Sequence, residues 1–134
     1  MEKKNWAIVD DDAIFHLTTK LLIQKQIHYR EIRTFFNGKE LIDFITESKN
    51  DPEVLPDIIL LDLYMPIMDG WDFLEEYLPI RNDLPKKITI YIISSSVDSK
   101  DIERAKSISA VKKYIVKPLD RHGLLDIIEE LKSE

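Results

Sequence analysis

Short apolar runs alternate along this chain with longer stretches of helical periodicity. Five such runs, each of strand length, follow one another at residues 6–9, 31–36, 58–61, 88–93 and 113–116. Runs of this length bounded by polar residues are typical of buried strands. Strict alternation of strands and helices predicts right-handed crossovers, a parallel sheet and helices on both of its faces. The expected fold is therefore α/β, with three layers and a doubly wound five-stranded sheet.

The helical stretches are each expected to bury one apolar face. Asp12 is expected to cap the first helix and Asp98 the fourth. The residues expected to point inward, helix by helix, are Ile14, Leu17, Leu21 and Ile27; Leu41, Phe44 and Ile45; Leu74, Tyr77 and Leu78; Ile102, Ala105 and Ile108; and Leu124, Ile127, Ile128 and Leu131. With no repeat or linker in the sequence, we expect residues 1–134 to form one domain without an output domain.

Reactive or charged side chains directly follow four of the five predicted strands. Asp10 and Asp11 follow the first run, Asp62 the third, Ser94 the fourth and Lys117 the fifth. The carboxyl ends of parallel strands meet at one edge, where open α/β sheets bind ligands. Converging carboxylates repel, and a hard divalent cation such as Mg²⁺ relieves this. The set suits a phosphate site in which a carboxylate could take up a phosphoryl group as an acyl phosphate.

Composition narrows the possible functions. A net charge of −6 argues against non-specific binding to nucleic acid, which needs a basic face. The absence of cysteine excludes disulfides, thiolate catalysis and zinc–thiolate sites. His16, His28 and His122 have no metal-ligand spacing, and each is expected to be exposed or partly buried. Apolar runs are too short to cross a bilayer, so a cytoplasmic protein with no membrane partner is expected.

Four motifs give the chain a family resemblance. They are Val9-Asp10-Asp11, the segment from Asp62 through Met65-Pro66 to Asp69-Gly70, the hydroxylic pair Ser94-Ser95, and Tyr114-Ile-Val-Lys117-Pro118. Together and in this order, they make the chain resemble a response-regulator receiver domain of bacterial two-component signalling. The resemblance implies a flavodoxin-like (βα)5 fold with strand order 2-1-3-4-5.

The resemblance also implies roles for individual residues. Asp62 would be the phosphoacceptor. Asp11 would bind Mg²⁺ directly, Asp10 mainly through ordered water, and the backbone carbonyl of Tyr64 would complete the protein ligands. Lys117 would pair with Asp62 and then with the phosphoryl oxygens, and the bond from Lys117 to Pro118 would be cis.

The same resemblance implies a switch. Ser94 would be the hydroxyl that moves toward the phosphoryl group, and Tyr114 the aromatic that follows it inward, although a plain half-buried strand tyrosine is an equal alternative. The helix from Asp98, the fifth strand and the last helix would form the surface that changes on phosphorylation.

Two departures from the family pattern matter. The spacing between Ser94 and Lys117 is one residue longer than usual, which leaves Ser94 and Ser95 both possible as the switch hydroxyl. We favour Ser94 because it directly follows the apolar strand. Tyr64, two residues after Asp62, is bulky, and we hypothesise that it screens the acyl phosphate from water.

The leading functional interpretation is a phospho-acceptor switch. It would take a phosphoryl group from a sensor histidine kinase or a histidine phosphotransfer protein, and catalyse only its own phosphorylation and dephosphorylation. Its signal would pass to an unknown downstream protein by contact or by onward phosphotransfer. Two alternatives remain: a receiver-like scaffold that works without phosphorylation, and a Mg²⁺-dependent aspartyl-phosphate phosphatase, which is disfavoured because Tyr64 occupies the place of its second Asp.

Overall fold

The computed structural model describes residues 2–134, in which strands and helices alternate. Its elements in chain order are β1 (Asn5–Val9), α1 (Ala13–Gln26), β2 (Glu31–Phe35), α2 (Gly38–Glu47), β3 (Ile58–Leu61), α3 (Gly70–Tyr77), the short 3₁₀ helix η1 (Arg81–Asp83), β4 (Thr89–Ser94), α4 (Ser99–Lys106), β5 (Val111–Val116) and α5 (Arg121–Lys132). The predicted alternation of strand and helix is confirmed.

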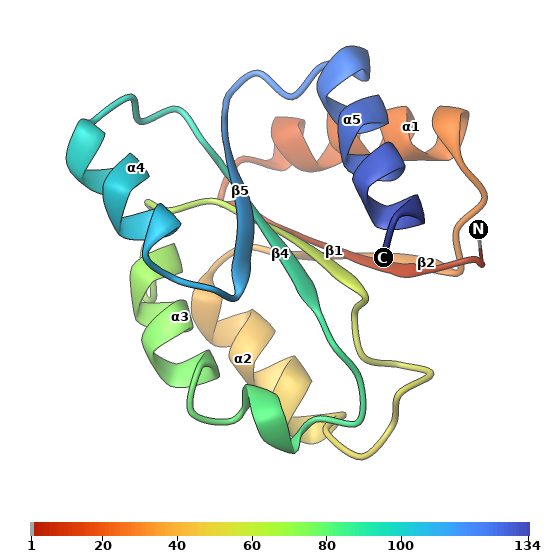
Figure 1. The fold of residues 1–134 in the computed structure, drawn as a ribbon, viewed down its shortest axis with the longest axis vertical. Helices are drawn as coiled ribbons and strands as arrows, with labels where there is room; N and C mark the ends of the chain where they lie inside the picture. Colours follow the sequence, from red (N-terminus) through yellow and green to blue (C-terminus); the bar gives the residue numbers. More distant parts are fainter. Residues whose placement is uncertain (1) are drawn as a thin grey trace.

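The five strands form one parallel sheet in the order β2-β1-β3-β4-β5. The predicted flavodoxin-like topology is therefore confirmed. Figure 1 shows α1 and α5 together on one side of the sheet and α2, α3 and α4 on the other. Among residues 2–134, the helices are all too short or too polar to cross a membrane.

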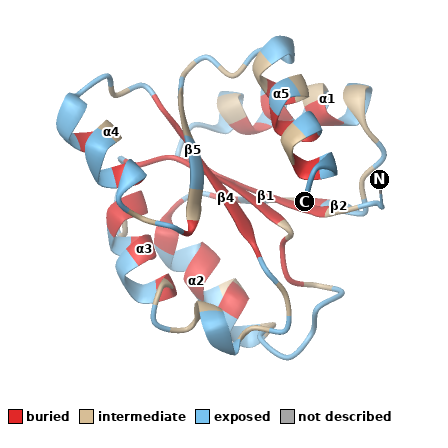
Figure 2. Ribbon diagram, in the orientation of Figure 1, coloured by how far each residue is buried: buried red, intermediate tan, exposed pale blue. Residues whose placement is uncertain are grey.

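The core lies in two layers, one on each face of the sheet. One layer packs α2 and α3 residues, with Ala105 of α4, against the sheet, and the other packs α1 and α5 residues against it. β1, β3 and β4 are buried along their whole length, as Figure 2 shows in red. Strands covered on both faces need apolar residues at every position, which explains the continuous apolar runs in the sequence.

Every α-helix starts at a side chain that accepts a hydrogen bond from the first turn. Asp12, Asn37, Asp69, Asp98 and Asp120 are these N-caps, so the expected caps at Asp12 and Asp98 are confirmed. Asp69 also forms a capping box with Asp72. The helices α1, α3 and α4 therefore begin at fixed points close behind the ends of β1, β3 and β4.

The predicted inward face of the first helix is wrong at three of its four residues, and only Ile27 packs against the core. Ile14, Leu17 and Leu21 are 71%, 59% and 48% exposed, and the helix instead buries His16, Thr19 and Ile23. The exposed residues and the buried residues both recur at helical spacing. The exposed ones are the more hydrophobic, so the sequence pattern favours the wrong face. An apolar stripe thus runs along the outer face of α1, starting one turn from Asp11. The predicted inward residues of α5 are all buried.

Candidate functional site

The sheet ladder brings the predicted site residues to one edge. The backbone N–H of Asp10 donates to Phe35 O, that of Asp62 to Val9 O, and that of Lys117 to Ser94 O, at 2.8 to 3.0 Å. Asp10, Asp62 and Lys117 each directly follow the last residue of a strand. All three therefore lie at the carboxyl edge of the sheet. Ser94 is the last residue of β4 in this ladder.

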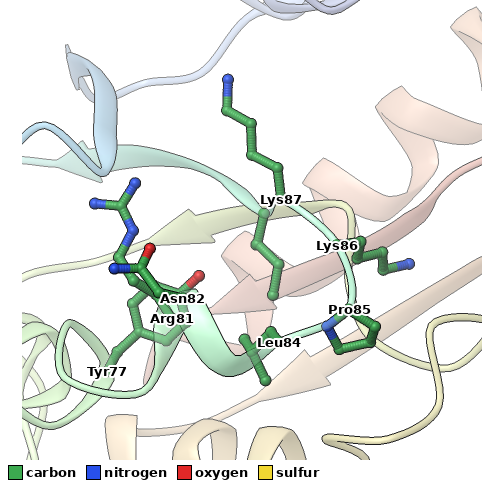
Figure 3. A pocket seen from close by; sticks show the side chains of 8 residues that line it. Tyr77, Arg81, Asn82, Leu84, Pro85, Lys86 and Lys87 are labelled. Carbon is green, nitrogen blue, oxygen red and sulfur yellow. The ribbon is translucent and has the colours of Figure 1, made fainter.

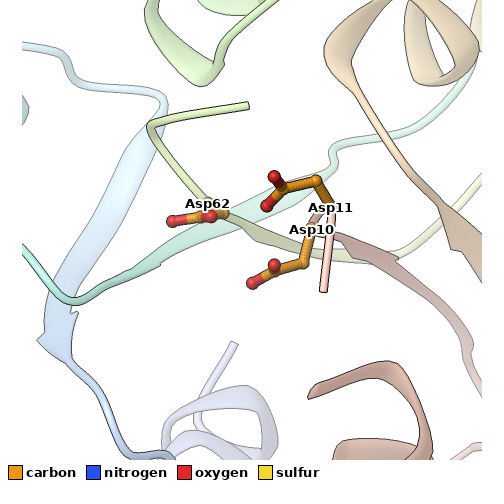
Figure 4. Close-up of side chains that lie close together, drawn as sticks. All are labelled: Asp10, Asp11 and Asp62. Atoms are coloured by element: carbon orange, nitrogen blue, oxygen red, sulfur yellow. The ribbon is translucent and has the colours of Figure 1, made fainter. Parts of the chain in front are cut away.

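Three carboxylates converge at this edge. One oxygen each of Asp10, Asp11 and Asp62 lies within 4.8 Å of the others, and Figure 4 shows the three side chains close together at the ends of β1 and β3. Asp10 and Asp62 are buried, whereas Asp11 is exposed. Three hard oxygen donors at this spacing suit a divalent cation of the Mg²⁺ or Ca²⁺ type.

The electrostatics of Asp62 reflect this crowding. Burial first, and then the negative charge of Asp10, raise its pKa from 3.8 to about 6. Lys117 and the Leu63 N–H, which donates to Asp62 Oδ1 at 2.9 Å, act in the opposite direction but do not cancel the effect. The pocket thus holds more negative charge than its own protein groups neutralise.

Lys117 supplies the positive charge of the site. Its Nζ lies 2.7 Å from Asp10 Oδ2, 3.7 Å from Asp62 Oδ2 and 4.6 Å from the centre of the Phe15 ring. Burial alone would lower the pKa of the ammonium, but the hydrogen bond to Asp10 and the charge of Asp62 raise it. The peptide bond from Lys117 to Pro118 is cis, as expected. Phe15, which the sequence did not single out, lies against this lysine from α1.

The three serines after β4 differ in their surroundings. Ser94 is 1% exposed and its Oγ accepts from the Ser96 N–H at 3.1 Å, while Ser95 is exposed. The Ser96 hydroxyl donates to Asp101. Tyr114 is half-buried, and its hydroxyl donates to the Ser96 carbonyl at 2.8 Å. Of the two candidate hydroxyls, Ser94 is the one that lies inside the carboxyl edge.

The loop after β3 is shaped by two backbone features. The Gly70 N–H donates to Leu63 O at 2.8 Å, and a Cβ on Gly70 would lie 2.4 Å from the carbonyl oxygen of Asp62. Ile67 has φ 71° and lies in a γ-turn closed by the Met68 N–H and Pro66 O. The Asp62 backbone is therefore packed directly against the start of α3.

His16 corrects the expectation that all three histidines are exposed or partly buried. It is 6% exposed, its ring centre lies 4.8 Å from that of Phe36 with the two rings tilted, and its Nε2 lies 2.6 Å from the Asp10 carbonyl oxygen. The N–H at Nε2 therefore donates to the backbone of Asp10. His28 and His122 are exposed as expected. Apolar spacing could not reveal a buried polar residue in α1.

Comparison with known proteins gives the family. The family model described as "Response regulator receiver domain" matches residues 7–129, which covers all the residues of the site. This chain belongs to the receiver-domain family. A receiver domain is a phospho-acceptor signalling module of two-component systems rather than a conventional enzyme.

Curated relatives and solved structures agree with this assignment. A probable methanogenesis regulatory protein, FilR2, of Methanothrix harundinacea is 30% identical over 72% of this chain and 61% of its own length. The probable C4-dicarboxylate response regulator DctR of Bacillus subtilis is 28% identical over 99% of this chain and 55% of its own length. The receiver domain therefore spans little more than half the length of the curated relatives it matches.

Two solved structures match nearly end to end. A two-component response regulator from Cytophaga hutchinsonii has a TM-score of 0.84 at 25% identity, covering 99% of this chain and 100% of its own. A response regulator receiver protein from Dyadobacter fermentans has a TM-score of 0.76 at 30% identity, covering 94% and 95%.

The acidic cluster of this receiver domain fits the Mg²⁺ that the family implies. The donor set is all oxygen, and the raised pKa of Asp62 indicates a local excess of negative charge that a divalent cation would neutralise. The triad of Asp10, Asp11 and Asp62 is typical of the receiver Mg²⁺ site.

A second hollow lies at the opposite end of the sheet, around η1 and the loop into β4. Its volume is about 290 Å³. Figure 3 shows the side chains that line it, among them Arg81, Lys86 and Lys87. Its lysines are already paired: Lys86 lies 3.0 Å from Asp57, and Lys87 3.7 Å from Glu134. The hollow is remote from the carboxylates and adds nothing to their chemistry.

Proposed function

We propose that this receiver domain is a phosphorylation switch in which Asp62 accepts a phosphoryl group from a phosphohistidine. The observation that carries the proposal is the convergence of three carboxylates within 4.8 Å, with the Lys117 ammonium 3.7 Å from Asp62. A carboxylate nucleophile, a cation site and a lysine are the parts that phosphoryl transfer to an aspartate needs.

In the proposed reaction, a carboxylate oxygen of Asp62 attacks phosphorus and the phosphorus–nitrogen bond of the donor breaks. The leaving imidazole keeps the electron pair, so the product is an acyl phosphate. Asp10, Asp11 and the backbone carbonyl of Tyr64 would hold Mg²⁺, which supplies charge neutralisation for the phosphoryl oxygens when bound. Lys117 would pair with the phosphoryl oxygens once the charge on Asp10 is shared with the metal.

Ser94 and Tyr114 are proposed as the switch residues. Ser94 Oγ already accepts a hydrogen bond from Ser96, so its own proton is free to be donated to a phosphoryl oxygen. Movement of Ser94 would pull on Ser96, whose carbonyl accepts from the Tyr114 hydroxyl. The change would therefore reach β5 and α4, where a downstream protein could detect it.

The proposed phosphodonor is a protein, either a sensor histidine kinase or a histidine phosphotransfer protein. The support is the exposed apolar stripe of Ile14, Leu17 and Leu21 on α1, which begins beside the acidic cluster. A small phosphodonor would not need such a surface, whereas exposed apolar patches are typical of protein contact sites.

Intact mass after incubation with acetyl phosphate and Mg²⁺ tests the proposal. The wild type should gain one phosphoryl group, and Asp62→Ala should gain none. Chelation of Mg²⁺ should prevent labelling of the wild type. Absence of an adduct from every sample would favour the scaffold that works without phosphorylation, while steady turnover of a phosphomonoester would favour the phosphatase.

A further inference from the structure

Asp101 is the one acid of α4 that is buried. It is 8% exposed although it lies in the first turn of an otherwise polar helix. Its carboxylate accepts the Tyr64 hydroxyl at 2.7 and 2.8 Å and the Ser96 hydroxyl at 2.7 Å. A buried carboxylate is costly unless such donors satisfy it, so these bonds hold all three side chains in place.

The two donors come from the two loops that carry the chemistry. Tyr64 lies two residues after Asp62, and Ser96 lies two residues after Ser94. The backbone of Ser96 is itself bonded on both sides, since its N–H donates to Ser94 Oγ and its carbonyl accepts from Tyr114. One carboxylate on α4 thus joins the loop after the proposed phosphoacceptor to the loop after the proposed switch hydroxyl.

Neighbouring groups keep this carboxylate an acceptor. The hydrogen bond from Ser96 is the largest influence and lowers the pKa of Asp101, with smaller contributions in the same direction from Tyr64, Trp71 and Arg104, against the opposing effect of burial. Arg104 lies 4.3 Å over the Trp71 ring and 3.6 Å from Glu75. The Asp101 carboxylate is therefore ionised near neutral pH, and α4 is held to α3 through Arg104 as well.

The position of Tyr64 follows from these bonds. Its backbone is fixed by the Asp62 loop and its hydroxyl by α4, so the ring spans the gap between the two, although 55% of the residue is exposed. Without Asp101, an exposed tyrosine would be free to change rotamer. The ring can screen an acyl phosphate on Asp62 from water only while its far end is held.

We infer that Asp101 is a positioning residue: it holds the Tyr64 ring beside Asp62 and the Ser96 backbone beside Ser94, and so links the lifetime of the acyl phosphate to the position of α4. This inference rests on the proposed phosphorylation of Asp62. It assigns to α4 a role in the chemistry, through Tyr64, in addition to any role in partner contact.

A double-mutant cycle tests the link. Tyr64→Phe removes only the hydroxyl, and Asp101→Asn keeps the volume but removes the charge. After labelling with acetyl phosphate and removal of the donor, each variant should lose its phosphoryl group about three- to tenfold faster than the wild type, because an unanchored ring admits water. The double variant should be no faster than the faster single variant, since both changes act on the hydrogen bond between Tyr64 and Asp101.

Asp98→Ala is the matched control. The Asp98 side chain caps the same helix by accepting the Lys100 N–H. Its bonds to Asp101 and Ser96 are made by backbone groups, which the alanine retains. It should lower the stability of α4 and leave the phosphoryl lifetime within about twofold of the wild type. Wild-type lifetimes in both single variants, or effects that multiply in the double variant, would overturn the inference. So would an equal loss of lifetime in Asp98→Ala.

Amide hydrogen exchange of the unphosphorylated protein gives a second readout. The Ser96 N–H should lose protection in Asp101→Asn, which weakens the bond from the Ser96 hydroxyl, and keep it in Tyr64→Phe, which leaves that bond in place. Unchanged protection at Ser96 in Asp101→Asn would overturn the inference even in a protein that takes no label. Failure of wild-type labelling, by contrast, would reject the proposed function and leave the exchange result to decide the link.

Discussion

The Lys117 ammonium lies closer to Asp10, at 2.7 Å, than to Asp62, at 3.7 Å. The resemblance alone predicts pairing with Asp62, so the shorter bond to Asp10 is a refinement that the structure adds. In this arrangement Lys117 forms an ion pair with the Asp10 carboxylate, which is also part of the proposed Mg²⁺ site. Lysine and metal are therefore expected to compete for the same negative charge.

Lys117→Met should separate the two roles of this lysine. We expect about three- to tenfold tighter Mg²⁺ binding, because a competing positive charge is removed, together with slower labelling by acetyl phosphate, because the phosphoryl oxygens lose a partner. Calorimetric titration with Mg²⁺ and intact mass against time measure the two effects. Weaker Mg²⁺ binding in the variant would contradict the competition.

Asp62→Asn should stabilise the metal-free protein in a pH-dependent way. Burial and Asp10 raise the pKa of Asp62 to about 6 in the folded chain, from an ordinary value of 3.8. Between these values the folded protein binds more protons than the unfolded one, so the free energy of unfolding falls as the pH rises through this window, by up to about 3 kcal/mol. The variant should lack this loss.

Urea denaturation at pH 7.5 and at pH 4.5 measures the effect. The free energy of unfolding of Asp62→Asn should be clearly higher than that of the wild type at pH 7.5 and only slightly higher at pH 4.5. Excess Mg²⁺ at pH 7.5 should reduce the difference, because the cation stabilises the wild type by binding its folded form. An equal difference at both pH values would show that the charge of Asp62 is not the cause.

Leu17→Ser should affect transfer from a protein donor and not from a small one. Leu17 is 59% exposed on the apolar stripe of α1, so its replacement should change the free energy of unfolding by less than about 0.5 kcal/mol. We expect labelling by acetyl phosphate at the wild-type rate, and slower transfer from a purified histidine kinase that phosphorylates the wild type. If the kinase transferred its phosphoryl group to Leu17→Ser and to the wild type at equal rates, the apolar stripe of α1 would not be part of the contact with the donor.

Gly70→Ala should be far more costly than Gly123→Ala. A Cβ at Gly70 would meet the Asp62 backbone at 2.4 Å, whereas at Gly123 it would meet only side-chain atoms, at 3.2 Å and beyond. We expect a loss of more than about 2 kcal/mol at Gly70, and little change or a gain at Gly123, which lies inside α5. Thermal unfolding of the two variants under one set of conditions compares them directly.

The sequence was sufficient for the sheet and for the edge where the site lies. Buried parallel strands need continuous apolar runs, and the polar residue that ends each run marks the carboxyl edge, as at Asp10, Asp62 and Ser94. The face of α1 was not predictable in this way. Its buried side includes His16 and Thr19, whose polarity conceals the core-facing stripe. When a helix has two stripes of residues at helical spacing, periodicity alone does not show which of them packs against the core.

Asp101 escaped notice for a different reason. Its partner Tyr64 is 37 positions away in the chain, so no local pattern marks the contact. An acid in the first turn of a helix is usually explained by the helix dipole. Only the folded arrangement distinguishes a buried acceptor from an exposed acid. The start of β5 at Val111, two residues earlier than expected, accompanies a register shift against β4 and is similarly invisible in the sequence.

The anchoring of α4 has a consequence for how the fold opens. This helix buries only Asp101 and Ala105, while α5 buries four apolar side chains. Hydrophobic burial holds α5 regardless of events at the carboxyl edge, but α4 depends on hydroxyl groups that come from the pocket loops. Regions with few buried apolar contacts open at low free energy. We therefore expect α4 to open at a lower free energy than α5, and a modest electrostatic change at the carboxyl edge to shift the population of its open form.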